Sequence, residues 1–218
     1  MIVNDRREIV KDMAKTRIRS DVFEINNLET FCKIKMDMAR QNMLMFSFVN
    51  FDSSKSAGEK VLAEATAYID FPTAKLFAQD ILSGRITALA KKEQDRVSAA
   101  NEKYCKPIWT QMGGSNEKKC AEKGWRTDGK AISRVLNLTP GSKKPYILTI
   151  QQGAGESNDK GLIVPKFGTK PEVQIRVALD NDTLKQMALM INTHIDGFIA
   201  AQYARGAYEE ELPDKKVA

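Results

Sequence analysis

The chain has 218 residues and a mass of 24.4 kDa, enough to bury a core in one domain or two small ones. Hydrophobic residues make up 42% and charged residues 28%, as in an ordinary globular protein, and no apolar run approaches the roughly 20 residues of a membrane span. The net charge of +6 and the pI of about 9.1 favour a polyanion or an anionic surface as the partner.

Residues 1–27 form a basic N-terminal segment that is too charged to supply the apolar part of a signal peptide. The cysteines Cys32, Cys105 and Cys120 are odd in number and contain no CxxC pair. Free thiols suit a reducing compartment, so we expect a cytoplasmic protein without a disulfide framework. Zinc usually takes four N or S ligands, and His194 is the single histidine. We therefore expect no metal and no cofactor.

Residues 28–104 predict a first repeat, a meander of strands closed by a helix. Apolar and polar residues alternate in FCKIKMDMA and in MLMFSFVNF, and the short turn RQN between them predicts a hairpin. AEATAYID alternates in the same way and predicts a strand that ends at Asp70. DSSKSAGEK is poor in apolar residues and leaves open whether this half has three strands or a fourth that begins near Glu59. The closing helix is expected from Pro72 to about Lys103.

Residues 105–129 are predicted to be a connecting loop, because they are rich in Gly, Ser and charged residues. Residues 130–206 predict the second repeat, with strands in AISRVLNL, YILTIQQ and VQIRVALD. KGLIVPKF predicts an edge strand, because its proline lacks the N–H that a central strand needs. A helix from Asp182 to about Arg205 closes this repeat, and residues 207–218 are expected to form a flexible tail.

The strongest sign of duplication lies at the two junctions between strand and helix. Asp70, Thr73 and Lys75 of the first junction align with Asp180, Thr183 and Lys185 of the second. Each aspartate can cap free N–H groups of the helix that follows it. We therefore predict an α+β fold of two tandem β-meander-plus-helix repeats, with antiparallel sheets packed with two long helices.

Apolar residues cover a wide surface of the second helix, more than packing on a single sheet demands. They are Leu184, Met187, Ala188, Met190, Ile191, Ile195, Phe198 and Ile199. We expect part of this surface to contact the helix of the other repeat and part to contact a second subunit. The chain is therefore predicted to form a homo-oligomer.

Sites for catalysis are scarce in this sequence. One histidine argues against most acid–base schemes that depend on histidine, and Asp70 and Asp180 already serve as helix-start residues. GAGES resembles a fragment of a phosphate-cradling loop, but no GK[ST] follows it and a strand comes next, so a flexible hairpin tip is the preferred interpretation. We expect a binding protein rather than an enzyme.

Basic residues recur on the predicted strands and turns of both halves, with aromatic residues among them. The predicted nucleic-acid-binding residues are Lys33, Lys35, Arg40, Trp109, Trp125, Arg134, Lys143, Lys144, Tyr146, Lys160, Lys166 and Arg176. Cations that follow phosphates and flat side chains that stack on bases together hold single-stranded nucleic acid. For Phe46, Phe48 and Tyr146 the alternative is burial in the core, and for the lysines it is solvation alone.

The two tandem units from Leu28 to Arg205 resemble the Whirly family and the related single-repeat coactivators that bind melted DNA. The resemblance implies a doubled strand-meander-plus-helix fold whose sheets bind single-stranded DNA, commonly as an oligomer. The Lys-Gly-Lys-Ala-Ala-Leu motif of plant Whirly proteins has only a partial counterpart here, DGKAIS at residues 128–133, and it lies in the second half. No residue role is carried over from it.

Three functions follow from these features. The leading prediction is a single-stranded DNA-binding protein, largely independent of sequence, that serves replication, recombination or transfer of a mobile element. The second is an RNA-binding protein on the same fold. The third is an interaction scaffold without nucleic acid, assembled through its apolar helices.

Overall fold

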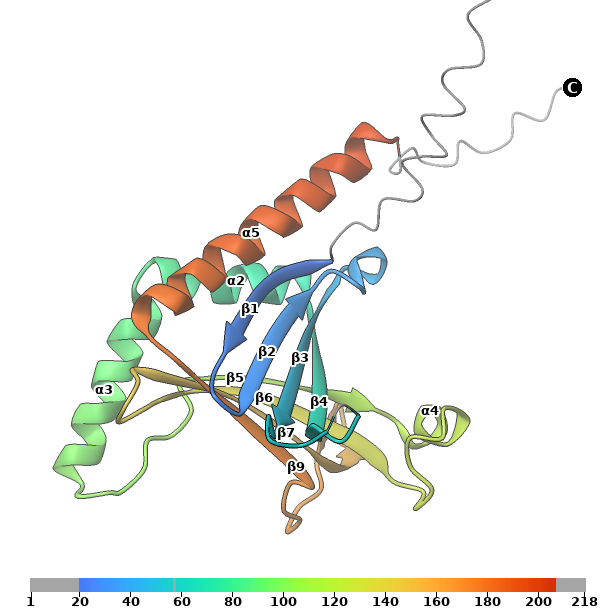
Figure 1. Cartoon of the computed structure of the whole chain (residues 1–218), viewed down its shortest axis with the longest axis horizontal. Coiled ribbons are helices and arrows are strands. Elements are labelled where there is room, and N and C mark those ends of the chain that lie inside the picture. Colours follow the sequence, from blue (N-terminus) through green and yellow to red (C-terminus); the bar gives the residue numbers. More distant parts are fainter. Residues whose placement is uncertain (1–19, 57, 207–218) are drawn as a thin grey trace, which may run out of the picture.

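The computed structural model describes residues 20–56 and 58–206. Most of the predicted basic segment, residues 1–19, and the predicted tail, residues 207–218, lie outside the described residues. Figure 1 shows two antiparallel sheets that cross each other, with the longer helices gathered along one side and a short helix at the opposite end. The predicted α+β fold with two sheet-and-helix repeats is confirmed.

The first sheet is a meander in which each strand pairs with the next, in the order β1-β2-β3-β4. Its strands are β1 (Asp21–Asn26), β2 (Thr30–Lys35), β3 (Met43–Phe51) and β4 (Val61–Asp70), with the short 3-10 helix η1 (Ala39–Gln41) in the β2–β3 turn. The predicted β2–β3 hairpin is confirmed. The fourth strand, however, is β1, upstream of the expected repeat and not near Glu59, so the boundary predicted at residue 28 falls inside this sheet.

The second sheet has the strand order β5-β6-β7-β8, and β9 also pairs with β7. Its strands are β5 (Trp109–Ser115), β6 (Ala131–Pro140), β7 (Tyr146–Ser157), β8 (Ile163–Pro165) and β9 (Val173–Leu179). Strand β7 is long enough to pair with β9 along its first part and with β8 along its end. As predicted from Pro165, β8 is an edge strand.

The predicted loop at residues 105–129 instead contains β5 and the short helix α4 (Glu117–Glu122). Strand β5 pairs with β6 along its whole length. Its Gly114 is required by a close approach, because a Cβ there would lie 2.2 Å from the Ile132 carbonyl oxygen. Glycines that indicate a loop by composition therefore mark tight strand packing here.

GAGES is also part of a strand and not a hairpin tip. It forms the end of β7, and the tip follows at Asn158–Gly161. A Cβ on Gly155 would lie 2.8 Å from the Ser133 nitrogen and 2.8 Å from Ile163 Cγ2. The glycine thus lets β6 and β8 pack closely against β7.

Both repeats end in the same strand-to-helix junction. Helix α2 (Phe71–Leu82) follows β4, and helix α5 (Asn181–Ala204) follows β9. The Asp70 carboxylate accepts a hydrogen bond from the Thr73 N–H at 2.9 Å, and the Asp180 carboxylate accepts one from the Thr183 N–H at 2.8 Å. The matched residues in the sequence therefore share one structural function, the capping of a helix N-terminus.

The first closing helix is shorter than the predicted span to Lys103. It breaks at Ser83 and Gly84, where Gly84 adopts a left-handed conformation with φ +82°, and α3 (Arg85–Ala99) leaves in a new direction (Figure 1). The second closing helix agrees with the prediction to within one residue at each end.

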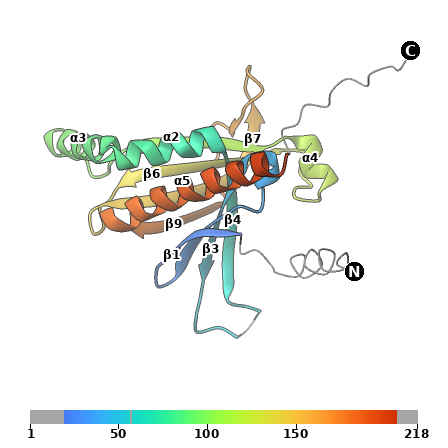
Figure 2. The ribbon, with the colours of Figure 1, turned by 90° about the horizontal axis from the view of Figure 1, so that it is seen from above.

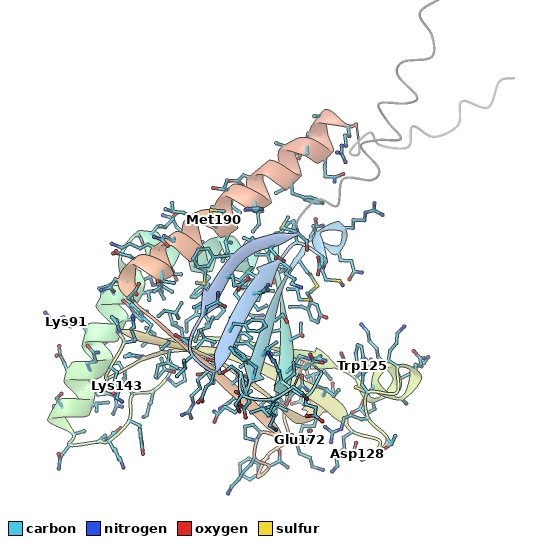
Figure 3. All side chains as sticks on the ribbon, viewed as in Figure 1. Lys91, Trp125, Asp128, Lys143, Glu172 and Met190 are labelled. Carbon is cyan, nitrogen blue, oxygen red and sulfur yellow. The ribbon has the colours of Figure 1, made fainter. Side chains whose placement is uncertain are left out.

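Helices α2 and α5 lie side by side (Figure 2). Phe71 and Phe198 pack edge to face with ring centroids 5.9 Å apart, and Lys75 forms an ion pair with Asp196. The predicted apolar surface of α5 is buried or half-buried within the chain, and Met190 packs against the core (Figure 3). The expected contact between the helices of the two repeats is confirmed.

One hydrophobic core joins both sheets and the helices. Phe46 and Phe48 of β3 are fully buried in it, as are Leu136 of β6 and Leu148 of β7. In β2 and β9 the other residue of each alternating pair lies on a half-buried or exposed face, whereas β6 is buried on nearly its whole length. Among the described residues, no helix is long and apolar enough to cross a membrane.

Candidate nucleic-acid interface

Lys33 and Lys35 lie on the outer face of β2, opposite the buried Ile34, as the alternation predicts. The two lysines differ in their surroundings. Lys33 Nζ forms an ion pair with Glu24 Oε2 at 2.8 Å and lies 5.7 Å from the centroid of the Phe31 ring. The hydrogen bond between the pair raises the pKa of Lys33 and lowers the pKa of Glu24. The positive charge of Lys33 is therefore largely balanced by the negative charge of Glu24 on the neighbouring strand.

Lys35 belongs to a row of side chains that crosses the outer face of the first sheet. Strand pairing places Lys35 opposite Met45, and Met45 opposite Tyr68. Because neighbouring strands lie about 4.8 Å apart, Lys35 and Tyr68 are roughly 10 Å from each other on one surface. The side chain of Tyr68 is 37% exposed. The sequence prediction omitted Tyr68, although AEATAYID places it on the polar side of its strand.

Two of the predicted aromatic residues are not available for stacking. Tyr146 is 2% exposed, and its hydroxyl lies 3.2 Å from Thr87 Oγ1. The core alternative is therefore correct for this residue. Trp109 begins β5 rather than lying in a loop, and its half-buried ring stacks on Phe77 with centroids 3.9 Å apart.

Several predicted cations lie away from the first sheet. Lys143 and Lys144 are in the β6–β7 turn, and Lys144 Nζ lies 3.2 Å from the capping carboxylate of Asp180. Figure 3 shows Lys143 at the end of the molecule that also carries Lys91, opposite the end that carries Trp125. Arg176 is on the outer face of β9 and donates to Gln174 Oε1 at 3.1 Å. The predicted residues therefore do not form one continuous face.

Arg134 and Trp125 do come together, in a cleft between the two sheets that we call the inter-sheet cleft. Its volume is about 560 Å³, and β4, β5, β6, the β7–β8 hairpin and the α4 region all contribute to its walls. Its lining includes Tyr68, Asp70, Met112, Lys119, Trp125 and Arg134. The guanidinium carbon of Arg134 lies 5.7 Å from the centroid of the Trp125 ring, which is 47% exposed. The row from Lys35 to Tyr68 leads to this cleft.

Arg134 is a half-buried cation with neutral neighbours. Its Nε donates to Gln152 Oε1 at 3.3 Å, and one terminal nitrogen donates to Ser115 Oγ at 3.2 Å. In the described part of the chain, no carboxylate lies within salt-bridge distance of it. Burial lowers the pKa of Arg134, yet an arginine side chain stays charged at neutral pH. A half-buried charge without an ionic partner attracts an anion.

The short helix α4 and the loop after it hold Trp125 at the cleft. The Asn116 side chain caps α4 by accepting from the Lys119 N–H at 2.9 Å, and the buried Cys120 anchors it from below. Arg126 then donates to the carboxylates of Asp128 and Glu172, with contacts of 2.6 and 2.9 Å. These hydrogen bonds lower the pKa of Asp128. The contacts of Arg126 with Asp128 and Glu172 hold the loop that carries Trp125 against the segment before β9.

The β7–β8 hairpin brings two further predicted cations toward this region. Lys160 lies in the tip, directly before Gly161 and Leu162, which line the cleft. Lys166 follows β8, and the adjacent Phe167 is 96% exposed. The end of the second sheet thus combines several lysines, exposed aromatic rings and the guanidinium of Arg134.

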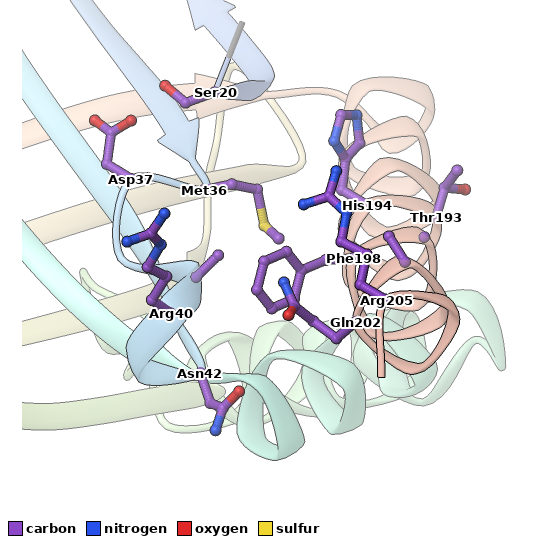
Figure 4. A pocket seen from close by; sticks show the side chains of 13 residues that line it. Ser20, Met36, Asp37, Arg40, Asn42, Thr193, His194, Phe198, Gln202 and Arg205 are labelled. Atoms are coloured by element: carbon purple, nitrogen blue, oxygen red, sulfur yellow. The ribbon is translucent and has the colours of Figure 1, made fainter. Parts of the chain in front are cut away.

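Arg40 lies elsewhere, at a larger cavity of about 950 Å³ between η1 and the C-terminal half of α5 (Figure 4). Figure 4 shows the ring of Phe198 pointing into it, with Asp37 and Arg40 on one side and Arg205 on the other. This cavity is lined by Asp37, Arg40 and Arg205 and lies apart from the row that leads from Lys35 to the inter-sheet cleft.

Cys32, Cys105 and Cys120 are all free, and Cys32 and Cys120 are buried. Within the described ranges, His, Cys, Asp and Glu side chains form no group of three that could hold a metal ion.

A scan against protein-family models gives no match, and a search of curated proteins gives none either. A search of solved structures aligns 91% of the chain with 92% of the plant transcriptional regulator PBF-2, at 9% identity and a TM-score of 0.45. WHY1 from Arabidopsis thaliana aligns over 90% of this chain and 98% of its own, at 8% identity and a TM-score of 0.41. MRP1/MRP2 of Trypanosoma brucei aligns over 93% and 97%, at 9% identity and a TM-score of 0.37. The interface described above stands on this chain's own residues.

Proposed function

We propose that the protein binds single-stranded DNA, largely without regard to sequence. The strand would follow the outer face of the first sheet from Lys35 past Tyr68 and reach the inter-sheet cleft at Trp125 and Arg134. The observation that carries this proposal is the cleft, where Arg134, which has no carboxylate partner among the described residues, lies beside the Trp125 ring and shares the lining with the exposed Tyr68. The cation would bind the phosphates of the strand, and its unpaired bases would stack on the rings.

The exposed rings favour a single strand over a duplex. Bases inside a duplex already stack on one another, so they can reach Tyr68 or Trp125 only if the duplex opens. The neighbouring lysines, Lys119 and Lys160, add attraction to phosphate that carries no sequence information. Processes that expose single strands, such as replication, recombination or transfer of a mobile element, would use such a protein.

Titration of fluorescently labelled oligonucleotides tests this function directly. Anisotropy at low salt is measured with single-stranded DNA, single-stranded RNA and duplex DNA. We expect single-stranded DNA to bind more tightly than the duplex. Tighter binding of RNA would favour the RNA-binding alternative, and no binding of any oligonucleotide would favour the scaffold.

We further propose that the chain acts without catalysis, in a cytoplasmic compartment and as a homo-oligomer. The free thiols support a reducing compartment. Leu76 of α2 and Leu189 of α5 are exposed on the paired helices and offer a surface for a second copy. Light scattering at micromolar concentration measures the assembly, and a strict monomer would contradict that part. An oligonucleotide that stays intact during incubation with Mg²⁺ would support the absence of nuclease activity.

A further inference from the structure

The inter-sheet cleft is hollow, whereas the outer face that leads to it is a sheet surface. Its volume of about 560 Å³ lies within the range of pockets that enclose small ligands, about 300–1,000 Å³. Stacking of successive bases on a sheet requires only exposed rings. A hollow of this size next to that outer face can, in addition, enclose a ligand.

The walls of the cleft suit the two parts of a nucleotide. Met112, Leu162 and Trp125 leave exposed apolar surface at the cleft, which suits the flat faces of a base. Asp70 and Gln111 add polar atoms to the lining, where the edges of a base could form hydrogen bonds.

Arg134 has donors left over for a phosphate. A guanidinium carries five N–H donors, and the two hydrogen bonds to Gln152 and Ser115 use two of them. The remaining donors have the fork geometry that binds phosphate oxygens in pairs. The Trp125 ring lies 5.7 Å from this cation, so a base on the ring would have its own phosphate next to the guanidinium.

We infer that the inter-sheet cleft captures one unstacked nucleotide, with its base against Trp125 and Tyr68 and its phosphate on Arg134. This inference rests on the proposed function and adds to it a pocket that holds a single nucleotide. The chemical class of the ligand is a nucleoside monophosphate unit. It could come from a DNA strand or from a free nucleotide, and the experiment separates the two sources.

The two tryptophans of the chain make the test specific. A Trp109→Phe variant keeps an aromatic ring on Phe77 and leaves Trp125 as the sole tryptophan. Its fluorescence is measured during titration with a single-stranded oligonucleotide, with an abasic strand of the same length, and with a free deoxynucleoside monophosphate. Anisotropy of labelled strands is recorded in parallel.

We expect the base-containing strand to quench Trp125 and to bind roughly fivefold to a hundredfold more tightly than the abasic strand. Binding in the anisotropy assay with no change in Trp125 emission would overturn the captured nucleotide and leave the proposed function intact. Quenching by the free nucleotide, with no binding of any strand, would support the pocket and overturn the proposed function.

A second variant covers the case in which Trp109→Phe does not fold. The difference between the emission of the unmodified protein and that of the Trp125→Phe variant gives the emission of Trp125. We expect Trp125→Phe to remove most of the quenching, because Trp109 is stacked on Phe77 away from the cleft. Equal quenching in the two proteins would overturn the inference.

Discussion

Arg134 carries its charge in a place where charges are usually paired. Its neighbours Gln152 and Ser115 are neutral, and its guanidinium is half-buried beside Trp125. Removing a charged side chain from water without giving it an ionic partner costs free energy, and the rest of the fold must offset this cost. Departures from the usual pairing of buried charges are most often found at functional sites, and Arg134 is such a departure.

Replacing Arg134 by Gln is expected to weaken binding of single-stranded DNA by about tenfold to a hundredfold, because charge-assisted contacts to phosphate are lost. Thermal stability should stay the same or rise, since a poorly solvated charge is removed. Anisotropy titration and thermal unfolding measure the two effects. Arg176→Gln is the matched control, because Arg176 is exposed on β9 outside the cleft. Equal loss of binding in both variants would count against a special role for Arg134.

The salt dependence of binding should separate Lys35 from Lys33. Lys35→Ala is expected to reduce the slope of log K against log salt by about 0.7, the value for one phosphate contact on a single strand. Lys33→Ala should reduce it by less, because Glu24 already balances that charge. The two lysines share a strand and a face, so they are well matched. A larger change for Lys33 than for Lys35 would contradict the proposed track.

Asp180 predicts a particular pH dependence of stability. Hydrogen bonds from Thr183, and one from Lys144, lower the pKa of this carboxyl to about 2. In the unfolded chain the pKa of an aspartate is near 4. The lowered pKa of the folded state therefore stabilises the fold at pH values above 4, and this contribution disappears as the pH falls toward 2. Asp180→Asn retains a good helix cap but cannot titrate there. Between pH 4 and pH 2 the melting temperature of the unmodified protein should therefore fall more steeply than that of the variant; parallel curves would refute this.

At the scale of elements, close strand packing around glycines builds one wall of the cleft. Gly114 of β5 and Gly155 of β7 both approach Ile163 of β8, where added Cβ atoms would lie 2.7 and 2.8 Å from its Cγ2. Ile163 adjoins Leu162, and both line the cleft. The position of the hairpin thus depends on two residues without side chains.

Gly114→Ala should destabilise the protein by about 1–3 kcal/mol, because the added methyl group meets the Ile132 carbonyl oxygen and has no room. Gly113→Ala is the control in the same strand, since a Cβ at Gly113 meets nothing within 4 Å. Chemical denaturation measures both. Equal stability of the two variants would show that the strands separate easily at this point.

Local patterns predicted the elements whose signals are local. The alternation of apolar residues and the paired capping aspartates, Asp70 and Asp180, placed the main strands and both strand-to-helix junctions. Strand β5 was missed because Gly113 and Gly114 have the composition of a loop, and their reason for being glycine is the neighbouring strand. The break at Gly84 was missed because charged helical periodicity continues past it.

At the scale of the whole molecule, the site depends on contacts that no local pattern encodes. Arg134 and Trp125 were predicted as separate cations and rings, but the cleft forms only where β4 of the first repeat meets β5, β6 and the α4 loop of the second. Tyr146 was predicted to bind and is buried, because α3 packs against β6 after Gly84 and brings Thr87 to the Tyr146 hydroxyl. The crossing of the two sheets creates the site.

Photo-crosslinking on the unmodified protein tests the central claim most directly. A single-stranded oligonucleotide that contains 5-bromodeoxyuridine is bound at low salt and irradiated, and mass spectrometry identifies the crosslinked residues. We predict crosslinks at Trp125 or Tyr68, the exposed rings of the inter-sheet cleft. Crosslinks confined to Phe31 and Phe51, whose rings lie 5.9 Å apart on the outer face of the first sheet, would contradict this site. No crosslink at all, with no binding at low salt, would contradict the function.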